Sequence, residues 1–147
     1  MFARIVVGTD GSNTASEAVR QAVELASKYG SKLDVVSAFE PVPSGRLRDE
    51  AVEAPEDIQH QINPHEDVEA TLGAAGEVAK GAGVKFETFA RQGDPADAIL
   101  DVAEENKADL IVVGNKGMTG AKRFLLGSVP NKVSHHAPCS VLIVQTT

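Results

Sequence analysis

The chain has a single cysteine among its 147 residues, so it cannot form an internal disulfide. A lone thiol is typical of a reducing compartment, and we expect a cytoplasmic protein. No apolar run approaches the ~20 residues that a membrane-spanning helix needs. The first residues, 1–7, show no apolar stretch followed by a cleavage site, so they predict a strand rather than a signal peptide. The length predicts one domain over residues 1–147. Because the chain has no long apolar run, we expect no membrane partner.

Acidic residues are missing from the last part of the chain. Residues 110–147 contain four Lys or Arg and no Asp or Glu, whereas residues 1–109 have a net charge of −11. The total of −7 disfavours nucleic-acid binding, which depends on basic side chains that neutralise phosphates. An acid-free region in an acidic protein is suited to holding a small anion. Chance clustering in a short segment is the alternative.

Short β-branched runs alternate with segments whose apolar residues recur at helical spacing. The strands are expected at residues 4–9, 32–38, 84–90, 109–113 and 140–144. The helices are expected at residues 13–29, at 64–82, from 95 onward and at 128–135. This alternation predicts a parallel α/β sheet with helices on both faces. Ligands of such sheets bind beyond the carboxyl ends of the strands, where the strand order reverses.

Three local patterns refine this outline. Asp94 is expected to cap the third helix, with Pro95 as its first residue. The proline-rich segment 40–63 is expected to be a long surface loop, either mobile or functional, with one helical turn near residues 57–61. The 64–82 helix is expected to bury five residues, which are Val68, Leu72, Ala75, Val78 and Ala79.

A glycine-rich stretch follows the fourth strand. Gly114 and Gly117 are separated by two residues, and nine more precede Gly127 and Ser128. Glycines let the backbone approach a ligand and direct N–H groups at an anion, and a helix beginning at Ser128 adds further donors. The stretch is not a P-loop, and no Gly-x-Gly-x-x-Gly follows the first strand. It predicts a phosphate-binding loop of another kind.

The resemblance to a known family extends over nearly the whole chain outside 40–63. It is carried by the Gly-x-x-Gly and Gly-Ser spacing and by four segments, which are residues 5–12, 93–96, 125–133 and 138–144. Together they are similar to the nucleotide-binding members of the universal stress protein family. The resemblance implies a three-layer, Rossmann-like open sheet of five parallel strands in the order 3-2-1-4-5. It also implies ATP or a related adenine nucleotide as ligand.

Carried over position by position, the resemblance assigns roles to individual residues. Asp10 would bind the ribose hydroxyls between the pocket walls Gly8 and Thr9, and Ala38 would contact adenine through its backbone. Val113 and Gly114 would pack near the base and sugar. The phosphates would be held by Asn115, Gly117, Gly127, Ser128 and Val129. Further candidate phosphate contacts are Lys116, Lys122, Arg123 and Pro130, the last at a position where some members have a hydroxyl residue.

Several of these residues have a structural alternative. Asp10 can instead be a turn or N-cap residue before the first helix, and Ser128 can be an N-cap. Lys122 and Arg123 can be solvated loop charges. The adjacent His135 and His136 point about 100° apart on a helix, so we interpret them as helix-end residues and predict no metal site. Cys139 is interpreted as a packed thiol.

The favoured function is a stress-response or signalling module that acts by binding ATP, with AMP or cyclic AMP as alternative ligands. No catalytic residue is predicted, because phosphoryl transfer needs carboxylates to hold a metal and Asp10 is the only acid expected near the phosphates. Mg²⁺ bound through the phosphates, slow ATP hydrolysis and autophosphorylation stay open. The third possibility is an interaction module. The resemblance implies a homodimer through the last strand, whose residues are Val141, Leu142, Ile143 and Val144.

Overall fold

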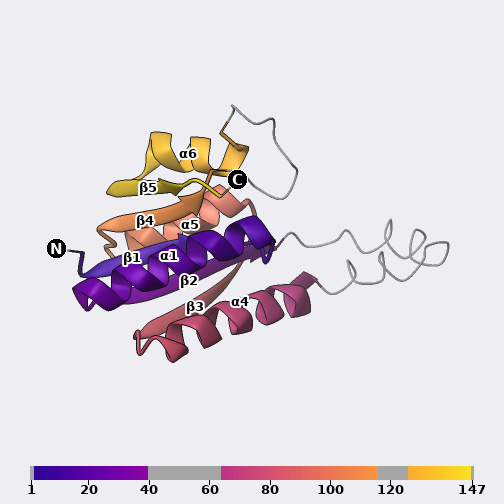
Figure 1. Ribbon diagram of the computed structural model, residues 1–147. Coiled ribbons are helices and arrows are strands. Elements are labelled where there is room, and N and C mark those ends of the chain that lie inside the picture. Colours follow the sequence, from indigo (N-terminus) through magenta and orange to yellow (C-terminus); the bar gives the residue numbers. More distant parts are fainter. Residues whose placement is uncertain (1, 40–63, 116–125, 147) are drawn as a thin grey trace, which may run out of the picture.

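The computed structural model describes residues 2–39, 64–115 and 126–146. Its five strands are β1 Arg4–Gly8, β2 Lys32–Phe39, β3 Phe86–Gln92, β4 Leu110–Gly114 and β5 Ser140–Val144. All four strand pairs are parallel, and the order across the sheet is β3-β2-β1-β4-β5. The expected strand order is therefore confirmed (Figure 1).

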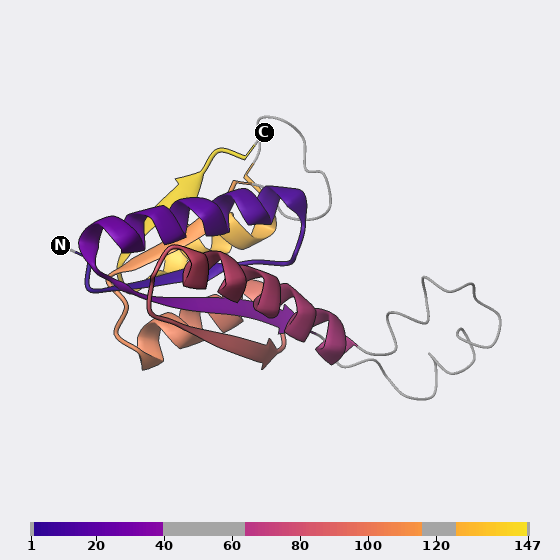
Figure 2. The same ribbon diagram turned by 60° about the horizontal axis from the view of Figure 1, so that its bottom comes forward.

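Helices cover both faces of this sheet. They are α1 Asn13–Tyr29, α4 Pro64–Gly81, α5 Pro95–Glu105 and α6 Ser128–His136. Buried residues of α1 and α4 pack with one set of strand residues, and those of α5 and α6 pack with the alternate set. Figure 2 shows α1 and α4 side by side on the same face. None of the helices within the described ranges is long and apolar enough to cross a membrane.

Local hydrogen bonds set the boundaries of α1 and α5. Ser12 is the N-cap of α1, where its side chain accepts a hydrogen bond from the Ala15 N–H. Gly30 ends that helix with φ of 65°, a conformation that glycine adopts without steric cost. Asp94 caps α5 by accepting from the Asp97 N–H, with Pro95 following it as predicted. Local hydrogen bonding therefore fixes where α1 and α5 begin.

Two details differ from the sequence prediction. Val78 was expected to face inward but is 45% exposed, because the buried positions 68, 72, 75 and 79 already form one stripe at helical spacing. The third strand was expected at 84–90 but begins at Phe86. Val84 instead donates its N–H to the Ala79 carbonyl and closes the end of α4. The predicted loop 40–63 and its helical turn lie outside the described residues.

One buried ion pair lies near the amino ends of the strands. The Asp34 side chain is fully buried, and its carboxylate accepts from Arg4 Nε at 2.8 Å, from a second Arg4 nitrogen at 3.3 Å and from Asn106 Nδ2 at 3.2 Å. These contacts join β1, β2 and the residue that ends α5. The Asp34 hydrogen bond is the main cause that raises the pKa of Arg4.

We expect Arg4→Met to lower the free energy of unfolding by about 3 kcal/mol, because it leaves the Asp34 carboxylate buried without its cation. Urea denaturation measures the change. The control is Lys32→Met, which removes an exposed 2.7 Å pair with Glu87 and is expected to cost less than ~1 kcal/mol. Equal losses in the free energy of unfolding for the two variants would contradict the larger contribution expected from the buried pair.

Candidate functional site

The strand order reverses at β1, which pairs with β2 on one side and β4 on the other. The chain leaves β1 toward α1 on one face, and after β4 it reaches α6 on the opposite face. A pocket of about 260 Å³ lies at the carboxyl ends of these strands. It is lined by Gly8, Thr9, Asp10, Ala15, Val36, Ala38, Pro95, Ile99, Val113, Gly114, Ser128, Val129 and Pro130.

Most of the residues proposed from sequence line this one pocket. Segments as distant as residues 8–10, 38, 113–114 and 128–130 meet there. Asn115 and Gly127 are described but are not among the lining residues. Gly117, Lys116, Lys122 and Arg123 lie outside the described residues. The pocket is thus built largely from the predicted segments.

Sequence reasoning missed four apolar lining residues, which are Ala15, Val36, Pro95 and Ile99. Val36 and Ile99 are buried and belong to the core beneath α5 and α6. Their positions in regular elements marked them as core, and only the packing of α5 against the sheet turns them toward the pocket. They give the pocket a mainly apolar wall.

Asp10 lies on the pocket and also takes part in a turn. It lines the pocket with an exposed residue surface, and its Oδ1 accepts a hydrogen bond from the Ser12 N–H at 2.9 Å. It is therefore a turn residue, whereas the N-cap of α1 is Ser12. A carboxylate has about four lone-pair sites, so this single bond leaves capacity for hydroxyl donors.

Asn115 and Gly127 hold the two ends of the glycine stretch together. The Gly127 N–H donates to the Asn115 carbonyl at 3.0 Å, and the Asn115 N–H donates to the Val144 carbonyl at 2.9 Å. Asn115 Oδ1 accepts from both the backbone N–H and the hydroxyl of Thr146. These bonds attach the start of α6 to the ends of β4 and β5.

The start of α6 differs from the starts of α1 and α5. Gly127 occupies the N-cap and makes no side-chain cap hydrogen bond, so the interpretation of Ser128 as an N-cap is wrong. Ser128 is the first helical residue, and its residue surface is exposed. Uncapped N–H groups at a helix start attract anions. This end of the pocket is therefore suited to a negatively charged group.

Lys132, in the second turn of α6, contacts the start of α5. Its ammonium lies 2.9 Å from Asp97 and 3.4 Å from Asp94. The backbone N–H of Asp97, together with the Lys132 ammonium, holds the pKa of Asp94 below its usual value. These contacts place the beginning of α6 beside the beginning of α5, where Pro95 and Pro130 line the same pocket.

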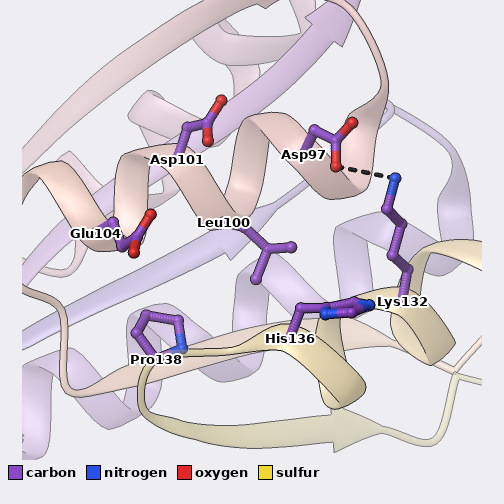
Figure 3. Close-up of a pocket in the computed structure, with 7 residues that line it drawn as sticks. All are labelled: Asp97, Leu100, Asp101, Glu104, Lys132, His136 and Pro138. Carbon is purple, nitrogen blue, oxygen red and sulfur yellow. Dashed lines mark ion pairs between the residues drawn. The ribbon is translucent and has the colours of Figure 1, made fainter.

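A second cavity, of about 370 Å³, lies between α5 and α6 on the outer side of these helices (Figure 3). Figure 3 shows Asp101 and Glu104 along α5, with His136 on α6 and the Asp97–Lys132 pair at one end. The charged residues that line this second cavity are exposed to solvent. Among the described residues, no three His, Cys, Asp or Glu side chains are arranged to hold a metal ion.

The remaining predicted features fall at the far end of α6. His135 and His136 occupy its last turn and are exposed. Cys139 is half-buried and packs against the core on this face. Burial, with a smaller contribution from Asp109, raises the pKa of its thiol. The interpretation of Cys139 as a packed thiol is confirmed.

The sheet order and the pocket define a doubly wound α/β domain with a pocket at its topological switch point. A model of the universal stress protein family matches residues 1–145. The chain belongs to the universal stress protein family.

Several relatives resemble the chain over its full length. Universal stress protein Rv1636 of Mycobacterium tuberculosis is 38% identical over 147 residues, which cover 99% of this chain and 98% of that protein. A crystal structure of a universal stress protein in complex with cAMP is 36% identical, covers 99% of both chains and has a TM-score of 0.74. The universal stress protein from Archaeoglobus fulgidus in complex with dAMP is 26% identical, with a TM-score of 0.68 and coverage of 97% of this chain and 98% of that one.

The floor of the pocket depends on a glycine. A Cβ at Gly8 would overlap Ile99 Cδ1 and would lie 2.9 Å from Ile99 Cγ1. We expect Gly8→Ala to displace the Ile99 side chain and to lower the free energy of unfolding by about 1–3 kcal/mol.

The matched control is Gly73→Ala in α4, where an added Cβ meets nothing within 4 Å. There we expect a gain of about 0.5–1 kcal/mol, because alanine loses less chain entropy in a helix. Urea denaturation of both variants measures the difference. A Gly8→Ala variant as stable as the parent protein would show that this close approach does not constrain the pocket.

Proposed function

We propose that the chain binds an adenine nucleotide in the pocket between β1, β4 and α6, and that it acts through occupancy of this site. The observation that carries the proposal is that most of the positions which the family resemblance assigns to the nucleotide line one pocket. The relatives solved in complex with cAMP and dAMP support an adenine nucleotide as the class of ligand.

The composition of the pocket fits the parts of such a ligand. The apolar wall of Val36, Ile99 and Val113 suits the faces of a base, next to the backbone of Ala38. Asp10 lies on the same pocket and supplies acceptors for ribose hydroxyls. Ser128 and Val129 offer the N-terminal end of α6 to a phosphate. The roles of Asn115, Gly117, Gly127 and the basic residues 116, 122 and 123 toward the phosphates belong to the same proposal.

Action by occupancy follows from the shortage of acids near the phosphate end. Phosphoryl transfer requires carboxylates that hold a metal and a group that orients the nucleophile. Residues 110–147 contain no Asp or Glu, and among the described residues Asp10 is the only acid that lines the pocket. The family pattern favours ATP, with AMP and cyclic AMP as the other candidates, and Mg²⁺ would be bound through phosphate oxygens.

The ribose contact can be tested with a pair of ligands. Calorimetry is expected to show that the protein binds AMP about tenfold more tightly than 2′,3′-dideoxy-AMP, because a hydrogen bond to a charged group contributes about 1.5–3 kcal/mol. Asp10→Asn is expected to abolish most of that difference. Asp101→Asn, on the outer side of α5, serves as the control and should preserve it.

Two outcomes would count against this assignment. Absence of heat with any adenine nucleotide at millimolar concentration would overturn the proposed function. Binding in which Asp10→Asn keeps the full preference for the ribose hydroxyls would overturn the role of Asp10 alone.

We also propose that two copies of the chain pair along β5. This strand lies at the end of the sheet order, and its residues Val141, Leu142 and Ile143 are half-buried. An apolar edge strand presents backbone N–H and C=O groups that a second strand can pair with. The resemblance to the family supports the same arrangement.

Light scattering at micromolar concentration is expected to give twice the mass of the 15.4 kDa chain. Leu142→Lys should shift the protein toward the monomer, because a charge on the edge opposes strand pairing. Val78→Lys changes an exposed valine on α4 and should leave the dimer intact. A monomeric parent protein would contradict the proposal, as would a Leu142→Lys variant that stays dimeric.

A further inference from the structure

The turn between β1 and α1 separates two cavities. Thr9 lines both the pocket at the strand ends and a third cavity, of about 320 Å³, between α1 and α4. Asp10 lines the first of these cavities, whereas Gly11 and Thr71 line the third. Thr71 belongs to α4, which lies beside α1 on this face of the sheet (Figure 2). The residue proposed to bind the ribose is therefore next in sequence to one that faces α4.

Hydrogen bonds connect the residues of this turn to one another and to β2. The Thr9 N–H donates to the Val36 carbonyl at 2.9 Å, and the Gly11 N–H donates to the Thr9 hydroxyl at 3.2 Å. The Ser12 N–H donates to Asp10 Oδ1 at 2.9 Å. Because these bonds hold Asp10 from both sides, a displacement of Gly11 also displaces the Asp10 carboxylate.

Gly11 faces Thr71 at close range. An added Cβ at Gly11 would lie 2.7 Å from Thr71 Oγ1 and 3.4 Å from Thr71 Cγ2, and the three atoms nearest to it all belong to this side chain. Gly11 also has a φ of 82°, a conformation that favours glycine. At the other end of the turn, Gly8 makes a similar approach to Ile99 of α5. Helices from both layers thus hold the turn that carries Asp10.

We propose, building on the adenine-nucleotide site above, that Thr71 is a positioning residue for ribose recognition. Thr71 is not among the described residues that line the nucleotide pocket. It acts through Gly11, because its side chain prevents the turn from moving toward α4. The Asp10 carboxylate is thereby held within reach of the ribose hydroxyls, and a hydrogen bond weakens steeply as its geometry departs from the ideal. A side chain on α4 therefore sets how well the pocket beyond the turn discriminates between ligands.

The first test removes the support and leaves the sequence of the turn intact. Thr71→Ala deletes Oγ1 and Cγ2, the two atoms nearest an added Cβ at Gly11. Calorimetry is expected to show that this variant narrows the preference for AMP over 2′,3′-dideoxy-AMP from about tenfold to about threefold or less, because a displaced carboxylate makes a weaker hydrogen bond. Thr71→Val keeps the branched shape of the side chain and should keep the preference. The ratio of two affinities measured on one protein does not depend on how much of the sample is folded.

A second test uses the steric relation between the two residues. Gly11→Ala places a Cβ against Thr71 and strains the backbone of the turn, so it is expected to remove most of the preference. In that background Thr71→Ala should restore part of the preference, whereas in the parent protein the same substitution weakens it. A reversal of sign in this double-mutant cycle indicates direct contact between the two positions.

The matched control is Gly76→Ala on the same helix. An added Cβ there would lie 2.8 Å from Phe86 Cε2 of β3, away from the turn. Urea denaturation is expected to show a changed free energy of unfolding for this variant, and calorimetry an unchanged ligand preference. The comparison separates the positioning of Asp10 from a general effect of α4 packing.

The outcomes distinguish this proposal from the one on which it rests. An unchanged preference in Thr71→Ala would overturn the role of Thr71 and leave the nucleotide site in place, as would an equal loss in Gly76→Ala. Loss of the preference in Thr71→Val would overturn positioning by shape, and the absence of a sign reversal would contradict direct action on Gly11. Absence of binding by every adenine nucleotide would overturn the proposed function itself.

Discussion

The rest of the structure depends on the position of β1 between two parallel partners. Because β2 and β4 pair with opposite edges of β1, the chain segments that follow β1 and β4 must leave toward opposite faces. The helices therefore diverge at the carboxyl ends of the strands and leave an opening. Gly8 ends β1 at this point, and its lack of a side chain gives Ile99 the space to line the pocket. The site is a direct consequence of the sheet order.

The amino and carboxyl ends of the strands carry different kinds of polar contacts. Near the amino ends, the buried Asp34 carboxylate has its acceptors filled by Arg4 and Asn106. At the carboxyl ends, α1 and α5 are capped by Ser12 and Asp94, whereas α6 begins at a glycine without a side-chain cap. At α1 and α5 a side chain of the protein accepts from a first-turn N–H group, whereas at α6 no side chain does so. That difference separates the part that stabilises the fold from the part available to a ligand.

The sequence predicted the elements well because their signals are local. Apolar periodicity, the Asp94 cap and the Pro95 that follows it each act within a few residues, and the structure has all of them. The strand order came from the family resemblance, since periodicity does not specify which strands are neighbours. Val78 and Val84 were misassigned because their environment depends on how α4 ends and how it rests on β3.

The pocket could be predicted only in part for a similar reason. Asp10 and Ser128 stand in recognisable sequence segments, whereas Val36 and Ile99 resemble ordinary core residues until α5 is packed on the sheet. The hydrogen bond from the Gly127 N–H to the Asn115 carbonyl joins residues on either side of a long segment. No local sequence pattern predicts it. Interactions between distant segments therefore account for what sequence reasoning missed.

The hydrogen bond between Gly127 and Asn115 has an evolutionary consequence. It fixes both ends of the segment between them, and the entropy of closing a loop grows only slowly with its length, by about 0.6 kcal/mol for each doubling. A longer segment therefore adds little to the cost of closing the loop, because residues outside it hold its two ends. Ligand preference can diverge among descendants of this protein while the frame is inherited unchanged.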